Sequence, residues 1–188
     1  MIFWHIFFSA IWTAWAIYWF VSAVGNKAIA RSGSLRQRLT YSLPLWLGIL
    51  LFLGVNGRHA LHARFLPPSS FFVLLGALLV LSGLAFTVWA RVHLGGNWSG
   101  RVTLKQNHEL IRTGPYAWVR HPIYTGLIVA VVGNAFALGQ WQALLAAILI
   151  ALSFVIKLRF EERWMIETFG EAYSRYKAQV PALFPGIY

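Results

Sequence analysis

The sequence predicts an all-α integral membrane protein with five transmembrane helices and its N-terminus outside. Of its 188 residues, 59% are hydrophobic and only 11% are charged, whereas about a quarter of the residues in an average soluble protein are charged. The hydrophobic residues form long runs, and the 16 Lys and Arg residues lie mostly between those runs. Lipid rather than water is therefore expected to solvate most of the chain.

Five apolar segments are candidates for spans, because a spanning helix needs about 20 mainly apolar residues. The expected spans are 2–24, 41–55, 71–90, 123–138 and 141–156. The first is too long and too aromatic for a signal peptide, and no small-residue cleavage site follows it. Only Gly139 and Gln140 separate the last two spans, which predicts a tight helical hairpin.

The distribution of basic residues predicts the orientation. The successive connections contain 0, 4, 2, 5, 0 and 5 Lys and Arg residues. Short cytoplasmic loops carry an excess of these residues, so 25–40, 91–122 and 157–188 are expected in the cytoplasm. The net charge of +11 then indicates anionic lipid as a partner, rather than nucleic acid.

The chain has no internal repeat and no change of composition that would mark a second domain. We expect one membrane domain over 1–188, in which 1–90 supply the first three spans and 91–188 form the catalytic core. The polar stretches 91–122 and 157–188 are longer than span connections require. Function is therefore expected there.

Several chemistries are excluded by composition. The chain has no Cys, and its five acidic residues are all Glu, which removes thiolate chemistry, Ser-His-Asp hydrolysis and most magnesium-dependent phosphoryl transfer. His59 and His62 have helical spacing but no Asp, Glu or Cys nearby to complete a site. No metal is expected.

The segment from Arg91 to Tyr124 has the composition of a ligand-binding loop, since its glycines permit close backbone approach. Pro122, followed by an apolar run, places the start of the fourth span, and the free backbone donors of a helix start favour an anion. Arg120 and His121 precede it, either as ligand contacts or as interface anchors.

The tail after the fifth span holds four of the five acidic residues. Glu161 lies four residues after Lys157, so the two can share a helix face. The segment is either the partner of a ligand cation or an interfacial helix with solvated ion pairs. Gly170 is expected to end it, with a short helix at 171–179 folding back. A basic, aromatic loop opposite this segment suits S-adenosylmethionine, which carries a carboxylate, an ammonium and a sulfonium that aromatic faces attract.

Three sequence blocks identify a family. The stretches HELIRTGPYAWVRHPIYTG, the pair EE at 161–162 and FGEAYSRYKAQVP together resemble the isoprenylcysteine carboxyl methyltransferase family and its wider relatives among phospholipid methyltransferases. The resemblance covers roughly residues 91–188. The preceding LGGNWSG is similar to the prokaryotic members.

The resemblance implies a membrane enzyme that binds S-adenosylmethionine in a cytoplasmic pocket closed by C-terminal helices, while a lipophilic substrate enters from the bilayer. The implied location is a prokaryotic inner membrane. The cofactor-binding residues that it implies are His108, Glu109, Leu110, Ile111, Tyr116, Arg120, His121, Pro122, Ile123, Tyr124 and Glu161. Glu161 would contact the methionine ammonium. If the match to the family is shifted by one residue, Glu162 would make this contact instead. Lys157, Glu161 and Glu162 are the expected catalytic group.

Lys157 departs from the family pattern, because eukaryotic members have Arg at that position. Arg binds a carboxylate bidentately, whereas Lys offers a point charge, and Arg159 is the other candidate for this contact. The expected reaction is in-line transfer of the sulfonium methyl to an oxygen, nitrogen or sulfur nucleophile. An ionised carboxylate needs no general base, whereas an amine would need one, with His121 or Glu162 as candidates.

Three other functions remain open from the sequence. They are a membrane reductase of the sterol-reductase type that uses NADPH, a phospholipid amine N-methyltransferase, and a non-enzymatic membrane protein such as a transporter. Binding of S-adenosylhomocysteine would favour methyl transfer, and binding of NADPH without it would favour the reductase.

Overall fold

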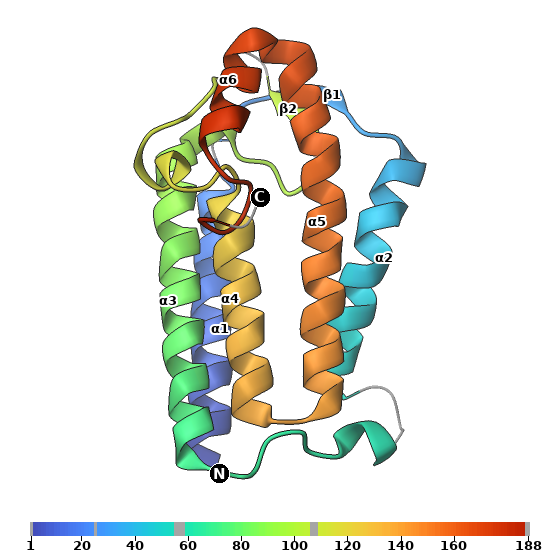
Figure 1. Cartoon of the computed structure of the whole chain (residues 1–188), viewed down its shortest axis with the longest axis vertical. Coiled ribbons are helices and arrows are strands. Elements are labelled where there is room, and N and C mark those ends of the chain that lie inside the picture. Colours follow the sequence, from blue (N-terminus) through green and yellow to red (C-terminus); the bar gives the residue numbers. More distant parts are fainter. Residues whose placement is uncertain (1, 25, 55–58, 106–108, 187–188) are drawn as a thin grey trace.

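Five long helices run along the long axis of the molecule in the computed structural model, which describes residues 2–24, 26–54, 59–105 and 109–186 (Figure 1). They are α1 (Ile2–Ser22), α2 (Leu35–Phe52), α3 (Ser70–Leu94), α4 (Pro122–Leu138) and α5 (Trp141–Phe169). By length and hydropathy, α1, α5 and α3 with its continuation to Asn97 can each cross a membrane, while α4 is apolar but shorter. The chain is accordingly an integral membrane protein.

Two helices, α2 and α5, extend furthest beyond the expected spans. The second helix begins at Leu35 rather than at 41, because Ser34 and Gln37 form a capping box with bonds of 3.2 and 3.1 Å that satisfies free donors at the helix start. Helix α5 continues without a break to Phe169, well beyond the expected end at 156. At 1.5 Å per residue its 29 residues extend about 44 Å, so its charged last turns project beyond a hydrocarbon layer of about 30 Å.

Glycines bring α3 and α4 into close contact. A Cβ on Gly76 would lie 2.4 Å from the carbonyl oxygen of Gly133, and one on Gly83 would lie 2.5 Å from that of Gly126. Gly48 likewise allows close contact between α2 and α5. Small residues let apolar helices gain van der Waals contact where the hydrophobic effect between them is absent, so these contacts define two helix pairs.

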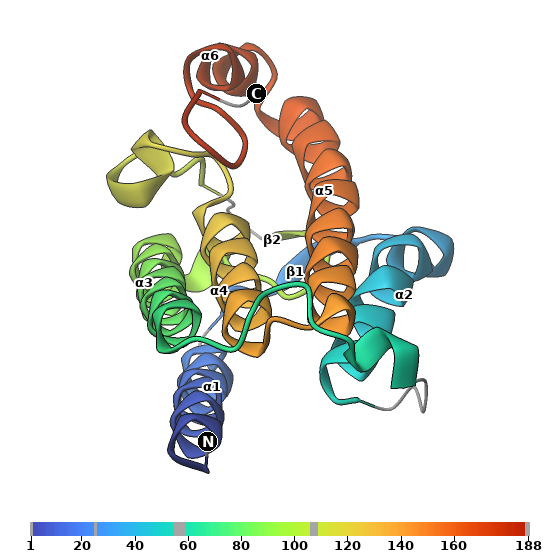
Figure 2. The same cartoon turned by 60° about the horizontal axis from the view of Figure 1, so that its bottom comes forward.

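The first helix lies at the edge of the bundle, beside α3 (Figure 2). None of its residues is buried. Trp15 Nε1 donates a hydrogen bond of 2.7 Å to Thr87 Oγ1, and the guanidinium of Arg91 donates to the carbonyl of Ser22 and to Asn26 Oδ1. Polar contacts therefore tie α1 to α3 at two levels.

The expected all-α fold also contains two short strands. Strand β1 (Ile29–Ser32) pairs antiparallel with β2 (Thr103–Lys105), with Ser32 opposite Thr103. The strands are only four and three residues long, and their sequences IARS and TLK show no sustained alternation of apolar and polar residues. Pattern reasoning therefore did not predict them.

All the remaining elements except one short 3-10 helix form a cap at one end of the bundle (Figure 1). The cap contains the two strands, the short 3-10 helices η2 (Gly95–Asn97) and η3 (Gly114–Ala117), and α6 (Glu171–Gln179). The other end holds the N-terminus, η1 (His59–His62) and the turn between α4 and α5. The two long polar stretches of the sequence thus meet at the same end.

The C-terminal tail folds back as expected. Helix α5 ends at Gly170, whose φ of 54° favours glycine, and α6 follows directly. The chain then returns over the start of α4, where the N–H groups of Arg120 and His121 donate to the carbonyls of Pro181 and Ala182 at 2.9 and 3.0 Å. The tail is therefore part of the cap.

Candidate functional site

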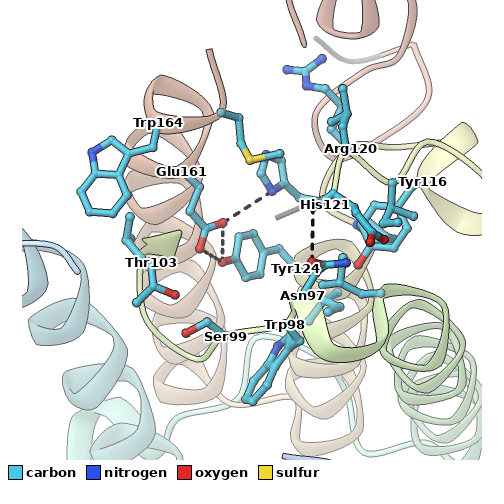
Figure 3. A pocket seen from close by; sticks show the side chains of 18 of the residues that line it. Asn97, Trp98, Ser99, Thr103, Tyr116, Arg120, His121, Tyr124, Glu161 and Trp164 are labelled. Carbon is cyan, nitrogen blue, oxygen red and sulfur yellow. Dashed lines mark hydrogen bonds and ion pairs between the residues drawn. The ribbon is translucent and has the colours of Figure 1, made fainter. Parts of the chain in front are cut away.

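A pocket opens within the cap, between the start of α4, the charged turns of α5 and the segment that follows α3 (Figure 3). Its cavity volume is ≈ 140 Å³, and it continues into an open mouth. Ligand sites in proteins are concave and combine apolar or aromatic walls with a few polar groups. The lining of this pocket is of that kind.

Every described member of the expected cofactor-binding set lines this pocket. These residues are Glu109, Leu110, Ile111, Tyr116, Arg120, His121, Pro122, Ile123, Tyr124 and Glu161. His108 lies outside the described residues. Lys157 and Glu162 lie next to the pocket but are not part of its lining.

Sequence reasoning missed a second group of lining residues. They are Asn97, Ser99, Arg101, Val102, Thr103, Trp164, Met165, Tyr173 and Tyr176. The motif LGGNWSG indicated the first part of this group, but the motif alone did not show which side chains face a ligand. Tyr173 and Tyr176 lie three residues apart on α6, a spacing that places both on one helix face, and both are buried against the site.

Glu161 is a partly exposed carboxylate in the pocket wall. Its side chain is 22% exposed, and the Tyr124 hydroxyl donates to it, with Oη at 2.7 and 2.8 Å from the two carboxylate oxygens. His121 Nδ1 lies 3.8 Å from Glu161 Oε2, and the His121 ring stacks on the Tyr124 ring with an interplanar angle of 4°. The carboxylate is therefore held in place on one side and open to the pocket on the other (Figure 3).

Glu162, by contrast, is enclosed by cations. Its Oε1 lies 2.7 Å from Arg120 Nε and 2.6 Å from Nη2, and its Oε2 lies 2.8 Å from Lys177 Nζ. His121 Nε2 lies 3.3 Å from Oε1. Arg120 also donates from Nη1 to the carbonyls of Lys177, at 3.1 Å, and Val180. Glu162 thus joins α5, the start of α4 and the C-terminal tail.

Lys157 lies one helical turn before Glu161. Its Nζ donates to the carbonyl of Gly100 at 2.9 Å and lies 3.9 Å from Glu161 Oε1. The ammonium faces two aromatic rings, with 5.3 Å to the centroid of Tyr124 and 5.7 Å to that of Tyr41, distances at which an aromatic face attracts a cation. Lys157 therefore anchors the loop after α3 to α5.

Tyrosines of the cap form another wall of the pocket. The hydroxyl of Tyr176 donates to the carbonyl of Tyr116 at 2.6 Å. Burial raises the pKa of Tyr176 to about 12 and holds the pKa of Tyr116 well above its ordinary value. Both tyrosines are therefore neutral hydrogen-bonding groups at physiological pH.

The start of α4 lies at Pro122, as the sequence predicts. The N–H groups just before it, of Arg120 and His121, already bond to tail carbonyls. Pro122, Ile123 and Tyr124, the first helical residues, line the pocket, and the N–H groups of a first helical turn have no intrahelical acceptor. At this helix start, the backbone donors left for an anionic group are therefore the N–H groups of Ile123 and Tyr124, because proline has no N–H and the N–H of Thr125 bonds to the carbonyl of His121.

The arrangement suits an organic ligand with separate polar groups. It offers the carboxylate of Glu161, a helix start and the aromatic rings of Trp98 and Tyr116. Thr103 Oγ1 is buried and has no hydrogen-bond partner among the described residues, so it is a ready contact for a ligand. Within the described part of the chain, no three His, Asp or Glu residues form a group that could hold a metal ion.

Comparisons with known proteins agree with this geometry. The sequence profile of the isoprenylcysteine carboxyl methyltransferase family matches residues 75–167, from α3 into the last turns of α5. The protein-S-isoprenylcysteine O-methyltransferase of Schizosaccharomyces pombe is 34% identical over 101 residues, which cover 52% of this chain and 43% of the yeast protein. The Saccharomyces cerevisiae enzyme of the same name is 33% identical over 117 residues, which cover 60% of this chain and 48% of that protein.

A solved structure, that of the eukaryotic intramembrane Ras methyltransferase ICMT, shares the fold. The two superimpose with a TM-score of 0.55 over 82% of this chain and 54% of that one, at 24% identity. The chain spans less than half the length of the two yeast relatives. The matched residues 75–167 include the pocket residues from α3 to α5 but not Tyr173 and Tyr176 of α6. This chain belongs to the isoprenylcysteine carboxyl methyltransferase family.

Proposed function

We propose that the protein transfers a methyl group from S-adenosylmethionine to an oxygen, nitrogen or sulfur nucleophile of a lipophilic acceptor that enters from the bilayer. An isoprenylcysteine-like carboxylate is the acceptor class that the names of the yeast relatives indicate. The observation that carries the proposal is Glu161, a partly exposed carboxylate held by Tyr124 in the wall of the cap pocket.

The pocket residues fit S-adenosylmethionine. Glu161 provides an anionic partner for the methionine ammonium, and the first turn of α4 provides backbone donors for the carboxylate. Trp98 and Tyr116 offer aromatic faces to the rings and the sulfonium. When bound, this cofactor supplies an electrophilic methyl group.

The residues of this chain contribute mainly by positioning. Tyr124 orients the Glu161 carboxylate, Lys157 fixes the loop that carries Gly100, and Glu162 holds the tail over the pocket. Alignment of two reactants can contribute about 7–11 kcal/mol to barrier reduction. A carboxylate acceptor would then need no base, whereas His121 is the pocket imidazole available to an amine acceptor.

The proposed topology has five spans, with the N-terminus outside and the cap in the cytoplasm of a prokaryotic cell, next to anionic lipid of the inner membrane. Support comes from the cap itself, because the basic segments 26–34 and 91–105 meet the tail at one end of the bundle. A topology reporter fused after Tyr188 should be active only in the cytoplasm. Activity outside would overturn both the orientation and the cytosolic source of the cofactor.

Methyl transfer is tested with labelled S-adenosylmethionine in membranes that contain the protein, followed by lipid extraction and mass analysis. Label in a prenylcysteine ester supports the carboxylate acceptor, whereas label in a phospholipid amine or a thiol identifies another acceptor atom. Equilibrium binding of S-adenosylhomocysteine is measured in parallel. Binding of NADPH without S-adenosylhomocysteine would contradict the proposal.

A further inference from the structure

The two arginines that line the pocket differ in whether the guanidinium group has hydrogen-bond or ion-pair partners. Arg120 is bound to Glu162 and to tail carbonyls. The Arg101 side chain makes no hydrogen bond or ion pair with any residue that the structure describes, and Arg101 is exposed at the pocket wall. Arg101 is therefore a pocket cation available to a ligand.

The backbone on both sides of Arg101 is held in place. The carbonyl of Gly100 accepts a hydrogen bond from Lys157 Nζ at 2.9 Å. Val102 is only 3% exposed, and its carbonyl accepts from the N–H of Gly33 at 3.2 Å. A guanidinium that extends from such a fixed base loses less entropy when it binds than one on a free loop.

Apolar surface reaches the level of this arginine. The bond between Gly33 and Val102 places the start of α2 beside the loop, and Leu35 and Leu39 in the first turns of α2 are 69% and 45% exposed. Long basic side chains at such a boundary keep their charge in the polar layer while their stems cover apolar surface. A lipophilic acceptor can therefore lie along α2 with its head group at Arg101.

Neither cation suggested by the sequence is as well placed for the acceptor. Lys157 Nζ is occupied by Gly100 and lies near Glu161, and Arg159 is exposed on α5 and absent from the pocket lining. We propose that Arg101 binds the carboxylate of the acceptor and thereby determines acceptor specificity. This inference rests on the methyl transfer proposed above.

Arg101 acts on binding and orientation, because a guanidinium and a carboxylate form two parallel hydrogen bonds. With one carboxylate oxygen held by Arg101, the other forms the new bond to the methyl carbon. The carbon–sulfur bond breaks with its electron pair on sulfur, and no proton leaves either partner. The products are a methyl ester and a neutral thioether.

The test uses N-acetyl-S-farnesylcysteine and its methyl ester, which differ by the negative charge. Equilibrium binding of both probes to the wild-type protein in nanodiscs, without cofactor, should show at least a tenfold preference for the acid. Arg101→Gln should reduce this preference to less than threefold, and Arg101→Lys should retain part of it. Arg163→Gln, which removes an exposed arginine of α5 outside the pocket, is the matched control and should keep the full preference.

Methyl transfer to the acid provides the second measurement. Arg101→Gln should raise the acceptor KM at least tenfold and leave S-adenosylhomocysteine affinity within twofold. An unchanged acid preference in Arg101→Gln, or no preference in the wild type, overturns the role of Arg101 even if methyl transfer occurs. If the wild type binds no S-adenosylhomocysteine and transfers no methyl group, the proposed function fails instead.

Discussion

Glu161 and Glu162 are neighbours on α5 whose environments differ sharply. Glu162 has a 7% exposed side chain surrounded by Arg120, Lys177 and His121, whereas Glu161 is 22% exposed and held mainly by the Tyr124 hydroxyl. Consecutive residues on a helix point about 100° apart, since a turn takes 3.6 residues. One carboxylate therefore joins segments of the cap, whereas the other faces the pocket.

The largest effect is expected from Glu162→Gln. This substitution keeps the size of the side chain but leaves the buried Arg120 without its counter-charge, which costs about 3–5 kcal/mol of folding free energy for a buried ion pair. Thermal unfolding of the detergent-solubilised protein should show a Tm lower by roughly 10 °C, because 1 kcal/mol shifts Tm by about 2–4 °C in a domain of this size. A Tm within 2 °C of the wild type would show that the cap does not depend on this cluster.

Glu161→Gln makes the same chemical change one residue earlier, but it should weaken ligand binding and leave the stability of the fold nearly unchanged. Loss of the anionic partner of a charged ligand group costs about 2–5 kcal/mol of binding, so affinity for S-adenosylmethionine should fall at least tenfold while Tm stays close to that of the wild type. Isothermal titration with S-adenosylhomocysteine and thermal unfolding measure the two quantities together. If affinity survives in Glu161→Gln but collapses in a folded Glu162→Gln variant, the assignment is shifted by one residue.

Tyr124→Phe tests whether Glu161 depends on its hydroxyl partner. The substitution keeps the ring that stacks on His121 and Phe154 and removes a hydrogen bond to a charged group, a loss of about 1.5–3 kcal/mol. The Tm should therefore fall by several degrees, and cofactor affinity should fall about tenfold because the Glu161 carboxylate is no longer held by the hydroxyl. A change in stability alone for Tyr124→Phe would place Glu161 outside the binding site.

His121→Ala should weaken both ligand binding and folding stability, because the His121 ring lies near Glu161 and Glu162.

The smallest effect is expected from Lys177→Met. Lys177 is one of the partners of Glu162, but its side chain is 33% exposed, and partly exposed ion pairs contribute only about 0–1 kcal/mol. The Tm should decrease by a few degrees at most, and S-adenosylhomocysteine affinity should change less than twofold. A Tm decrease as large as that of Glu162→Gln would show that Lys177, rather than Arg120, provides the main compensation for the buried carboxylate.

Hydropathy alone located the five long helices, because a run of apolar residues in lipid must form a helix to satisfy its backbone groups. Pro122 and Gly170 likewise marked the start of α4 and the end of α5. The early start of α2 at Leu35 was missed, although Ser34 and Gln37 form a recognisable capping box. Strands β1 and β2 were missed because each depends on the other, and they lie about seventy residues apart in the chain.

For the site, the sequence determined which residue types are present, their spacing along each helix and the family they belong to. It identified both glutamates but left their assignment open, since two adjacent residues on a helix are equally well placed until their neighbours are known. Only the tertiary structure distinguishes their surroundings, because Arg120 comes from the start of α4, Lys177 from α6 and Tyr124 from the first turn of α4. The difference between a charge that stabilises the cap and one that remains open to a ligand depends on contacts between distant segments, which only folding brings together.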